Sequence, residues 1–260
     1  MRRRPVRHLA LALALAWPSA GCRREAPRRE PIRIAAAADL ALAFTELGQA
    51  FGAAHGDEVI FSFGSTGLLA RQIVEGAPFD VFAAAHVRYV DDAVRAERCD
   101  GTTRALYARG RLALFWPRGV AAPSALRDLA APRFRRIAIA NPDHAPYGRA
   151  AHAALRQAGL LPTVEGRLVF GENVQQALQF AQSGNADAAL VALSLARAAT
   201  DGEHRLVEPS LHPPIDQALA LCRGASPDGG RRFIAFVRSS AGQALLARHG
   251  FLPVPQTPDR

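Results

Sequence analysis

Short apolar runs alternate along the chain with longer stretches in which apolar residues recur every three or four positions. The runs predict strands and the longer stretches predict helices, because side chains alternate across a strand but share a helix face every 3.6 residues. The predicted strands cover residues 32–37, 59–63, 81–84, 111–116, 137–140, 168–170, 188–192 and 218–221. The predicted helices cover residues 40–54, 68–75, 87–96, 147–158, 171–182 and 233–248.

This alternation predicts an α/β protein with mostly parallel sheets flanked by helices. In such sheets, ligands bind beyond the carboxyl ends of the strands. The chain has 260 residues, of which 49% are hydrophobic. That is enough apolar material to bury the core of one large domain or of two smaller lobes.

The segment of residues 61–82 reads FSFGSTGLLARQIVEGAPFDVF and carries the most informative local chemistry. A strand ends in Gly-Ser-Thr-Gly and an amphipathic helix follows, so Ser65 and Thr66 lie at the start of that helix. Free backbone N–H groups and two hydroxyls at the positive end of a helix form a cradle for an anion. Strand–turn–helix units are common, however, and a Ser or Thr at this position is also an ordinary helix cap.

Four junctions between a strand and a helix share this chemistry. Each precedes or opens a predicted helix: Ala38-Asp39, Ser65-Thr66, Pro146-Tyr147 and Asn173-Val174. Because helices of a doubly wound sheet begin at the same edge, we expect these four helix starts to face one anion.

The amino-terminal segment, residues 1–21, has the pattern of a secretory signal. Four arginines precede an apolar stretch at residues 9–17, which is too short to span a bilayer, since spanning takes about 20 residues. Small residues then lead to Cys22, which fits a bacterial lipoprotein signal, although Ser19 replaces the usual aliphatic residue. Plain cleavage that leaves Cys22 unmodified is the alternative. Residues 22–31 are rich in Arg, Glu and Pro and predict a flexible tether.

The formal net charge is +9, and all 32 residues in the Lys+Arg count are Arg. Four of them lie in the signal segment, which leaves 9 − 4 = +5 for the remaining chain. The arginines are scattered and no set of aromatic residues accompanies them, so nucleic-acid binding is not expected. A modest positive charge can instead attract anions.

Two cysteines remain beyond Cys22. In an oxidising compartment Cys99 and Cys222 can form one disulfide, or they can be two separate buried thiols. Neither has a His or Cys neighbour at the spacing of metal ligands, so no metal cation is expected.

Enzymatic chemistry finds little support in the sequence. The Gly-Ser-Thr-Gly segment does not match the G-x-S-x-G pattern of hydrolases, and it lacks the Gly-Lys-Ser/Thr of a nucleotide-binding loop. His144 is interpreted as a loop residue, and Asp80 as an acceptor in a structural turn. The pair Asp91-Asp92 does not suit acid–base catalysis. We therefore expect no enzyme and no cofactor.

Five segments resemble the periplasmic molybdate-binding proteins of ABC transporters, within the class of two-lobed solute receptors. They are RIAAAADL (33–40), FGSTGLLARQIVEGAPFDVFAAA (63–85), NPDHAPYG (141–148), GENVQQAL (171–178) and GQALLARHGF (242–251). The second and third segments are the most specific. The resemblance covers roughly residues 32–251, which is nearly all of the chain after the tether.

The resemblance implies a two-lobed periplasmic-binding-protein fold with the ligand in the cleft between the lobes. Lobe one is expected to cover residues 32–107 and 218–252, lobe two residues 108–217, and a tail residues 253–260. The implied function is a monomeric extracytoplasmic receptor that delivers molybdate or tungstate to the permease of an ABC transporter. With the signal, this implies a periplasmic protein anchored to the outer surface of the inner membrane through lipid on Cys22.

The resemblance also implies the positions that contact the oxyanion, which hydroxyls and backbone N–H groups hold without a counter-charge. These positions are Asp39, Thr66, Tyr147, Val174 and Ala192, and we expect the neighbouring Ser65 to contact the oxyanion as well. Ala192 stands where some family members have a Tyr hydroxyl, so one donor is expected to be missing.

Asp39 is the second departure, because this position is often Ser, Thr or Asn and a carboxylate repels an anion. The first expectation is that Asp39 turns away and caps its own helix. The others are that it is protonated in the complex, or that it accepts a proton from the ligand. The last would favour a phosphate-like anion, and a receptor for phosphate or sulfate is the alternative to molybdate. A secreted hydrolase is a more distant alternative.

Overall fold

The computed structural model of this protein describes residues 29–254. The expected signal segment, residues 1–21, and the expected lipidation site Cys22 lie outside this range, as do most of the tether and of the tail. No helix within the described range is long and apolar enough to cross a membrane.

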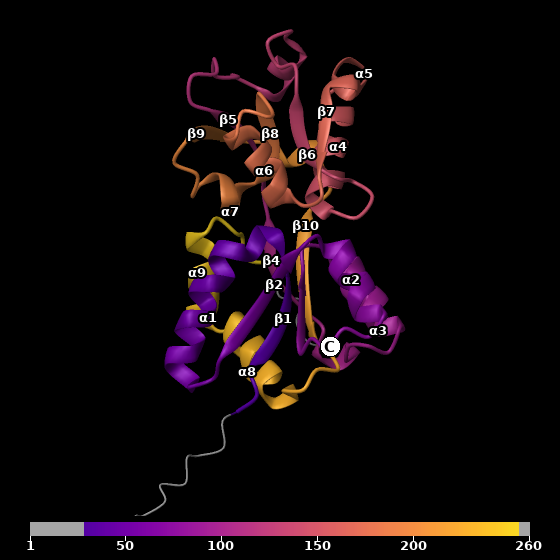
Figure 1. Cartoon of the computed structure of the whole chain (residues 1–260), viewed down its shortest axis with the longest axis vertical. Helices are drawn as coiled ribbons and strands as arrows, with labels where there is room; N and C mark the ends of the chain where they lie inside the picture. The colour runs from indigo at the N-terminus through magenta and orange to yellow at the C-terminus, as the bar shows by residue number, and fades with distance from the viewer. Residues whose placement is uncertain (1–28, 255–260) are drawn as a thin grey trace, which may run out of the picture.

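Two five-stranded sheets form two lobes that are stacked along the long axis of the molecule (Figure 1). The strands of the first sheet, in spatial order, are β2 (Val59–Gly64), β1 (Ile32–Ala37), β3 (Val81–Ala84), β10 (Ile215–Leu221) and β4 (Ala105–Gly110). Those of the second are β7 (Leu168–Gly171), β6 (Ile137–Ala140), β8 (Ala188–Ala192), β5 (Leu112–Pro117) and β9 (Gly202–Leu206).

Helices cover both faces of each sheet. In the first lobe α1, α8 and α9 lie on one side of the sheet and α2 and α3 on the other (Figure 1). The α-helices are α1 (Ala41–His55), α2 (Thr66–Val74), α3 (Val87–Arg95), α4 (Pro146–Gln157), α5 (Leu161–Val164), α6 (Val174–Gln182), α7 (Leu193–Ala196), α8 (Pro227–Arg238) and α9 (Ser240–Arg248). The 3-10 turns are η1 (Ala38–Leu40), η2 (Gly101–Thr103), η3 (Leu126–Ala130), η4 (Glu165–Arg167) and η5 (Pro209–Leu211).

Each sheet is mixed rather than mostly parallel. In the first sheet β1 pairs in parallel with β2 and β3, whereas β10 is antiparallel to both of its neighbours. The second sheet repeats this arrangement, with β5 as its antiparallel strand. The reason is the connectivity, since β10 and β5 each enter their sheet directly after the chain crosses from the other lobe. The first crossing is at Arg111 and the second follows β9. The chain therefore passes from one sheet to the other a few residues away from the lobe boundaries that the sequence predicted.

The sequence pattern missed strands β4 and β9, the short helices α5 and α7, and one helix break. Strand β9 lies at an edge with four of its five residues exposed, and its polar sequence GEHRL carries no apolar run. Strand β4 was also missed, and its apolar residues, 105–108, end at Arg109. The closing helical region is two helices, α8 and α9, which are separated at Ser239, and its hydroxyl accepts the N–H of Gly242.

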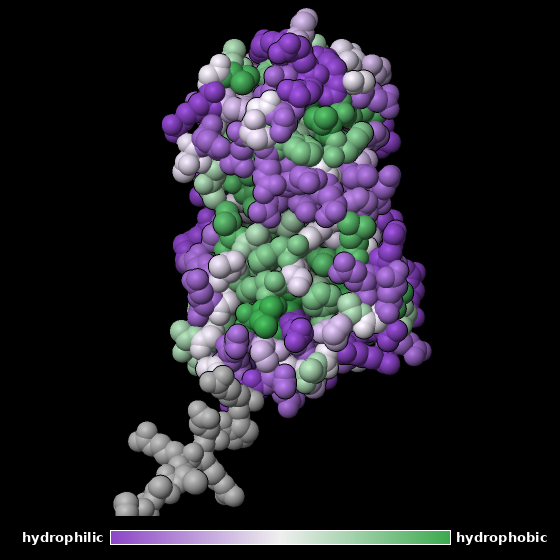
Figure 2. Space-filling view, viewed as in Figure 1, coloured by the Kyte–Doolittle hydropathy of each residue, from purple (hydrophilic) through white to green (hydrophobic). Residues whose placement is uncertain are grey.

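Both faces of the central strands are buried, which explains why β1 is apolar apart from the exposed Arg33 near its start. Its residues Ile32 and Ile34 pack into the main core, while Ala35 packs into a second cluster that includes Leu69 and Ile73 of α2. The surface differs from the core. Figure 2 shows an apolar area on the lower lobe and a mainly hydrophilic surface around it.

A disulfide joins Cys99, which follows α3, to Cys222 at the end of β10. The two residues are 123 positions apart and also form an isolated antiparallel bridge. The bond therefore links the first pass of the chain through this lobe to its return from the other lobe. A disulfide of this kind is typical of proteins outside the cytoplasm.

Candidate anion-binding site

The starts of four helical segments meet at one small cavity between the lobes. Turn η1 and helix α2 come from the first lobe, and helices α4 and α6 come from the second. The lining residues are Ala37, Ala38, Asp39, Gly64, Ser65, Thr66, Ala85, Ala145, Pro146, Tyr147, Asn173 and Val174. The expected convergence of the four junctions is therefore confirmed, and its cause is that each segment follows the carboxyl end of a parallel strand.

Backbone N–H groups at these helix starts are the main donors that the cavity offers. The first N–H groups of a helix have no partner within the helix and carry its positive partial charge. At α6 the side chain of Asn173 accepts the N–H groups of Gln175 and Gln176, both at 3.0 Å, and leaves the N–H of Val174. At α4 the first residue is Pro146, which has no N–H, so the N–H of Tyr147 comes first.

The hydroxyl of Thr66 can donate to an anion. Its Oγ1 accepts the N–H of Ala85 at 3.2 Å, and the side chain is buried among the lining residues. Within residues 29–254 this hydroxyl donates to no acceptor, so its own proton is available to an anion in the cavity.

Ser65 contacts the opposite lobe. Its Oγ lies 2.7 Å from Nδ1 of His144 and 3.1 Å from the carbonyl oxygen of the same residue. That carbonyl also accepts the N–H of Gly67 at 2.9 Å and the hydroxyl of Tyr89 at 3.3 Å. One backbone carbonyl of the second lobe thus receives three donors from the first lobe, and we call this arrangement the His144 clasp.

The pair Ser65–His144 is not arranged like a hydrolase dyad. In serine hydrolases the imidazole faces the serine through Nε2 and is oriented through Nδ1 by a carboxylate. Here Nδ1 faces Ser65, and among residues 29–254 no carboxylate bonds to His144. The expectation that His144 is a loop residue is confirmed, because it lies between β6 and α4.

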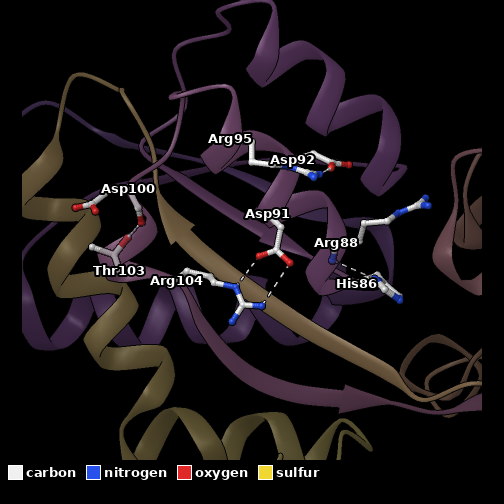
Figure 3. Close-up of polar contacts among 8 residues, drawn as sticks. All are labelled: His86, Arg88, Asp91, Asp92, Arg95, Asp100, Thr103 and Arg104. Atoms are coloured by element: carbon white, nitrogen blue, oxygen red, sulfur yellow. Dashed lines mark hydrogen bonds and ion pairs between the residues drawn. The ribbon is translucent and has the colours of Figure 1, made fainter. Parts of the chain in front are cut away.

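Carboxylates outside the cavity are engaged elsewhere (Figure 3). Asp91 accepts two N–H groups of Arg104, and Asp92 pairs with Arg95 along α3. Buried Asp80 accepts the N–H groups of Arg33 and Ser226 and is the structural acceptor that the sequence predicted. Among the described residues no cluster of His, Cys, Asp or Glu could hold a metal ion.

Asp39 faces the inside of the protein, and the expectation that it caps its own helix is wrong. Turn η1 and helix α1 have no side-chain cap. Instead, Oδ2 of Asp39 accepts a hydrogen bond from Nε2 of Gln217 in β10, and Oε1 of Gln217 accepts the hydroxyl of Tyr107 at 2.7 Å. The other carboxylate oxygen, Oδ1, is buried and has no hydrogen-bond partner within residues 29–254.

Burial raises the pKa of Asp39 from 3.8 to about 6, although the hydrogen bond from Gln217 acts in the opposite direction. The Tyr147 hydroxyl belongs to the same group, because its pKa is raised well above 10 by burial and by the charge of Asp39. This hydroxyl lies so close to Gly110 that a Cβ there would come within 2.1 Å of it. Asp39, Gln217, Tyr107 and Tyr147 form a buried polar group, which we call the Asp39 cluster.

Ala192 lies apart from the other expected site residues. It ends β8 and is fully buried, and it does not belong to the described residues that line the cavity. Sequence reasoning also missed Gln217, Tyr107 and Gly67. Gln217 had a signal, since it is an uncharged polar residue directly before the apolar run of β10 at residues 218–221.

Two α/β lobes that meet over a small cavity with uncharged N–H and O–H donors define a two-lobed binding protein. A model of the family described as bacterial extracellular solute-binding protein matches residues 32–252, and the chain therefore belongs to this family. The molybdate-binding protein ModA of Rhodobacter capsulatus is 31% identical over 248 residues, which are 94% of each chain. ModA of Azotobacter vinelandii is 33% identical over 233 residues, which are 85% of this chain and 89% of that protein.

Solved structures of binding proteins also resemble the structure of this chain. The periplasmic molybdate-binding protein of Azotobacter vinelandii superposes with a TM-score of 0.80 at 29% identity, covering 86% of this chain and 100% of that one. The sulfate-binding protein SubI of Mycobacterium tuberculosis has a TM-score of 0.77 at 18% identity and covers 88% of each chain, which shows a shared fold. The expected fold class and the resemblance seen in the sequence are confirmed, and the relatives are binding proteins rather than enzymes.

We predict that Asp39→Asn changes how stability depends on pH. The pKa of Asp39 is raised in the folded state, so its ionisation destabilises the folded protein as pH rises from about 4 through 6. The rise from 3.8 to about 6 corresponds to about 3 kcal/mol. Denaturant unfolding should therefore show that the variant gains about 3 kcal/mol relative to wild type between about pH 4 and pH 7. Parallel pH profiles for the two proteins would contradict this assignment.

We predict that Gly67→Ala opens the lobes. An added Cβ would lie 2.6 Å from the carbonyl oxygen of His144, at the centre of the clasp. The boundary between the lobes can yield more easily than a packed core, so we expect a larger radius of gyration by small-angle scattering and little change in the unfolding midpoint. Gly166→Ala is the matched control, because a Cβ there meets no atom within 4 Å. An unchanged radius for Gly67→Ala would show that the clasp does not hold the lobes together.

Proposed function

We propose that this chain is an extracytoplasmic receptor that captures molybdate or tungstate and delivers it to the membrane permease of an ABC transporter. The observation that carries the proposal is a cavity between two lobes whose donors are helix N-termini and the Thr66 hydroxyl, with no cationic side chain among its lining residues. The molybdate-binding relatives, at 31% and 33% identity, support this choice of anion.

Neutral donors suit the capture and release of an oxyanion. Several N–H dipoles share the negative charge, and in a cavity closed to water each hydrogen bond is stronger than in solution. No residue has to form a counter-ion, so the anion can leave when the lobes separate. Binding energy then selects the closed state, and a permease recognises the closed surface.

The cavity is smaller than any of the candidate anions, so a compact ion requires the least separation of the lobes. Its volume open to the centre of a water-sized sphere is about 10 Å³, which is room for about one water molecule. An anion of five heavy atoms would set the final spacing of the lobes, whereas an organic ligand would hold them apart.

A phosphate-like anion is the second candidate, and Asp39 is the observation that favours it. An ionised carboxylate only accepts hydrogen bonds, so it would select an anion that carries a proton. Sulfate belongs to the same alternative by its size, but it offers no proton to Asp39.

Isothermal titration of the protein lacking residues 1–22 with molybdate, tungstate, sulfate and phosphate tests the proposal. We expect molybdate and tungstate to bind one ion per chain and to bind more tightly than the other two. Thr66→Val should weaken their binding by about 10- to 100-fold, since a hydrogen bond to a charged group contributes about 1.5–3 kcal/mol.

Thr45→Val is the control for this variant, because Thr45 lies on the exposed face of α1 and its hydroxyl, among residues 29–254, bonds only to the carbonyl of Ala41. It should bind as wild type does. Absence of any heat or thermal shift with both molybdate and tungstate would refute the proposed function. A preference for phosphate would favour the second candidate instead.

We further propose that lipid on Cys22 anchors the receptor, as a monomer, to the outer surface of the inner membrane. The signal pattern of residues 1–21 and the periplasmic location named for the Azotobacter structure support this location. We predict that the full-length protein partitions into the membrane fraction and that Cys22→Ala moves it to the soluble periplasmic fraction. Equal partitioning of the two proteins would argue against the anchor.

A further inference from the structure

Asp39 is the one charged side chain among the described residues that line the cavity. It is 1% exposed, and its Oδ1 has no hydrogen-bond partner within residues 29–254. A dianion in this cavity would therefore lie beside a buried negative charge. Such an arrangement requires compensation, because two like charges at short range in a dry site strongly disfavour each other.

Within residues 29–254, no cationic side chain bonds to Asp39. Turn η1 packs against α1, α6, α7 and β2, and the last three contain no Asp, Glu, His or Arg. On α1, Glu46 bonds to Arg248 and His249, while His55 packs against Phe51 at the far end of the helix.

The charged residues on the elements that contact the Asp39 carboxylate do not bond to it either. On β10 and β4, Asp216 and Arg109 pair with each other at 2.6 Å. On α4, Arg149 bonds to the hydroxyl of Tyr89, and the remaining basic residues, His152 and Arg156, line a separate groove. The titratable groups that face Asp39 are the phenols of Tyr107 and Tyr147, which stay neutral because burial raises the pKa of each well above 10.

The hydrogen bonds of the Asp39 cluster leave room for a proton at one defined atom. Tyr107 donates to Oε1 of Gln217, so the amide presents Nε2 to Oδ2 of Asp39. Protonation at Oδ1 would leave that bond intact and would convert the unpartnered oxygen from an acceptor into a donor. No other group in the cluster has to change.

We infer that this receptor binds its dianion together with one proton, which the Asp39 carboxyl takes up at Oδ1. The inference rests on the proposed function and adds a condition to it. The loaded protein holds Asp39 as a neutral acid, and release of the anion returns the proton to solvent. Asp39 thereby makes the affinity for a dianion depend on pH in a site that otherwise has only neutral donors.

The direction of the pH dependence follows from the ionisation of Asp39. The pKa of Asp39 is already raised to about 6, mainly by burial, before any anion is present, and a neighbouring dianion raises it further. Between these two pKa values the empty protein is ionised and the loaded protein is protonated. In that range the affinity for molybdate falls by about tenfold for each unit by which the pH rises.

Isothermal titration with molybdate in buffers that differ in their enthalpy of ionisation tests the inference directly. At about pH 7.5 the observed enthalpy of wild type should change with the buffer in proportion to an uptake close to one proton per anion. Asp39→Asn should take up no proton, and its affinity should be independent of pH between about pH 7 and pH 8.5. Asp143→Asn is the control, because Asp143 is an exposed carboxylate of the loop before α4, and it should behave as wild type.

An infrared difference spectrum of wild type keeps the test informative if the Asp39 variants do not fold. Binding of molybdate should produce the C=O stretching band of a protonated carboxylic acid, and the carboxylate bands should lose intensity. Molybdate binding by wild type without proton uptake, or proton uptake that persists in Asp39→Asn, would overturn the inference and leave the proposed function standing. Failure of wild type to bind molybdate or tungstate at all would refute the proposed function itself.

Discussion

Backbone N–H groups at four helix starts are the feature on which the arrangement of the site depends. A helix cannot satisfy its own first N–H groups, and here the fold directs four such starts at one cavity. At these helix starts, side chains cap only some of the free N–H groups. Asn173 caps two N–H groups of α6 and leaves that of Val174, while the side chain of Ser65 bonds across the cleft and does not cap α2. The donors of the proposed site are therefore groups that the secondary structure leaves unpaired.

Contacts between the lobes use backbone carbonyls as acceptors on both sides of the cavity. The carbonyl of His144 in the second lobe receives donors from the first, and the carbonyl of Asp39 in the first lobe receives the Ser194 hydroxyl at 2.7 Å. Such contacts depend on where the loops lie more than on which side chains they carry. Separation of the lobes would break only a few hydrogen bonds, each with a modest net contribution of about 0.5–1.5 kcal/mol. This is the balance that a receptor needs if an anion is to decide between its open and closed forms.

The Asp39 cluster joins the cavity to the strands that continue from one lobe to the other. Asp39 lines the cavity, whereas Gln217 and Tyr107 belong to β10 and β4, which adjoin the two crossings between the lobes. A buried carboxylate with one free oxygen destabilises the fold, and natural proteins retain such groups mainly at functional sites. Its position beside uncharged donors, in a cavity without cations, is the main chemical difference between this site and a purely dipolar one.

Local patterns along the chain predicted the strands and helices with regular apolar spacing, the α/β class, and the helix starts that line the cavity. These features are local, because periodicity and turn residues act over a few positions. These patterns did not predict β9, whose exposed edge needs no apolar run, or the antiparallel direction of β10 and β5, which depends on where the chain crosses between the lobes.

The orientation of Asp39 shows the same limit at the site. A carboxylate before a helix fits a cap by local rules, and only the tertiary structure brought Gln217, 178 positions later in the chain, within hydrogen-bond distance of it. The clasp between Ser65 and His144 is likewise decided by the approach of the two lobes. Contacts between distant segments depend on the packing of whole sheets. Rules that act over a few positions of the chain therefore cannot predict them.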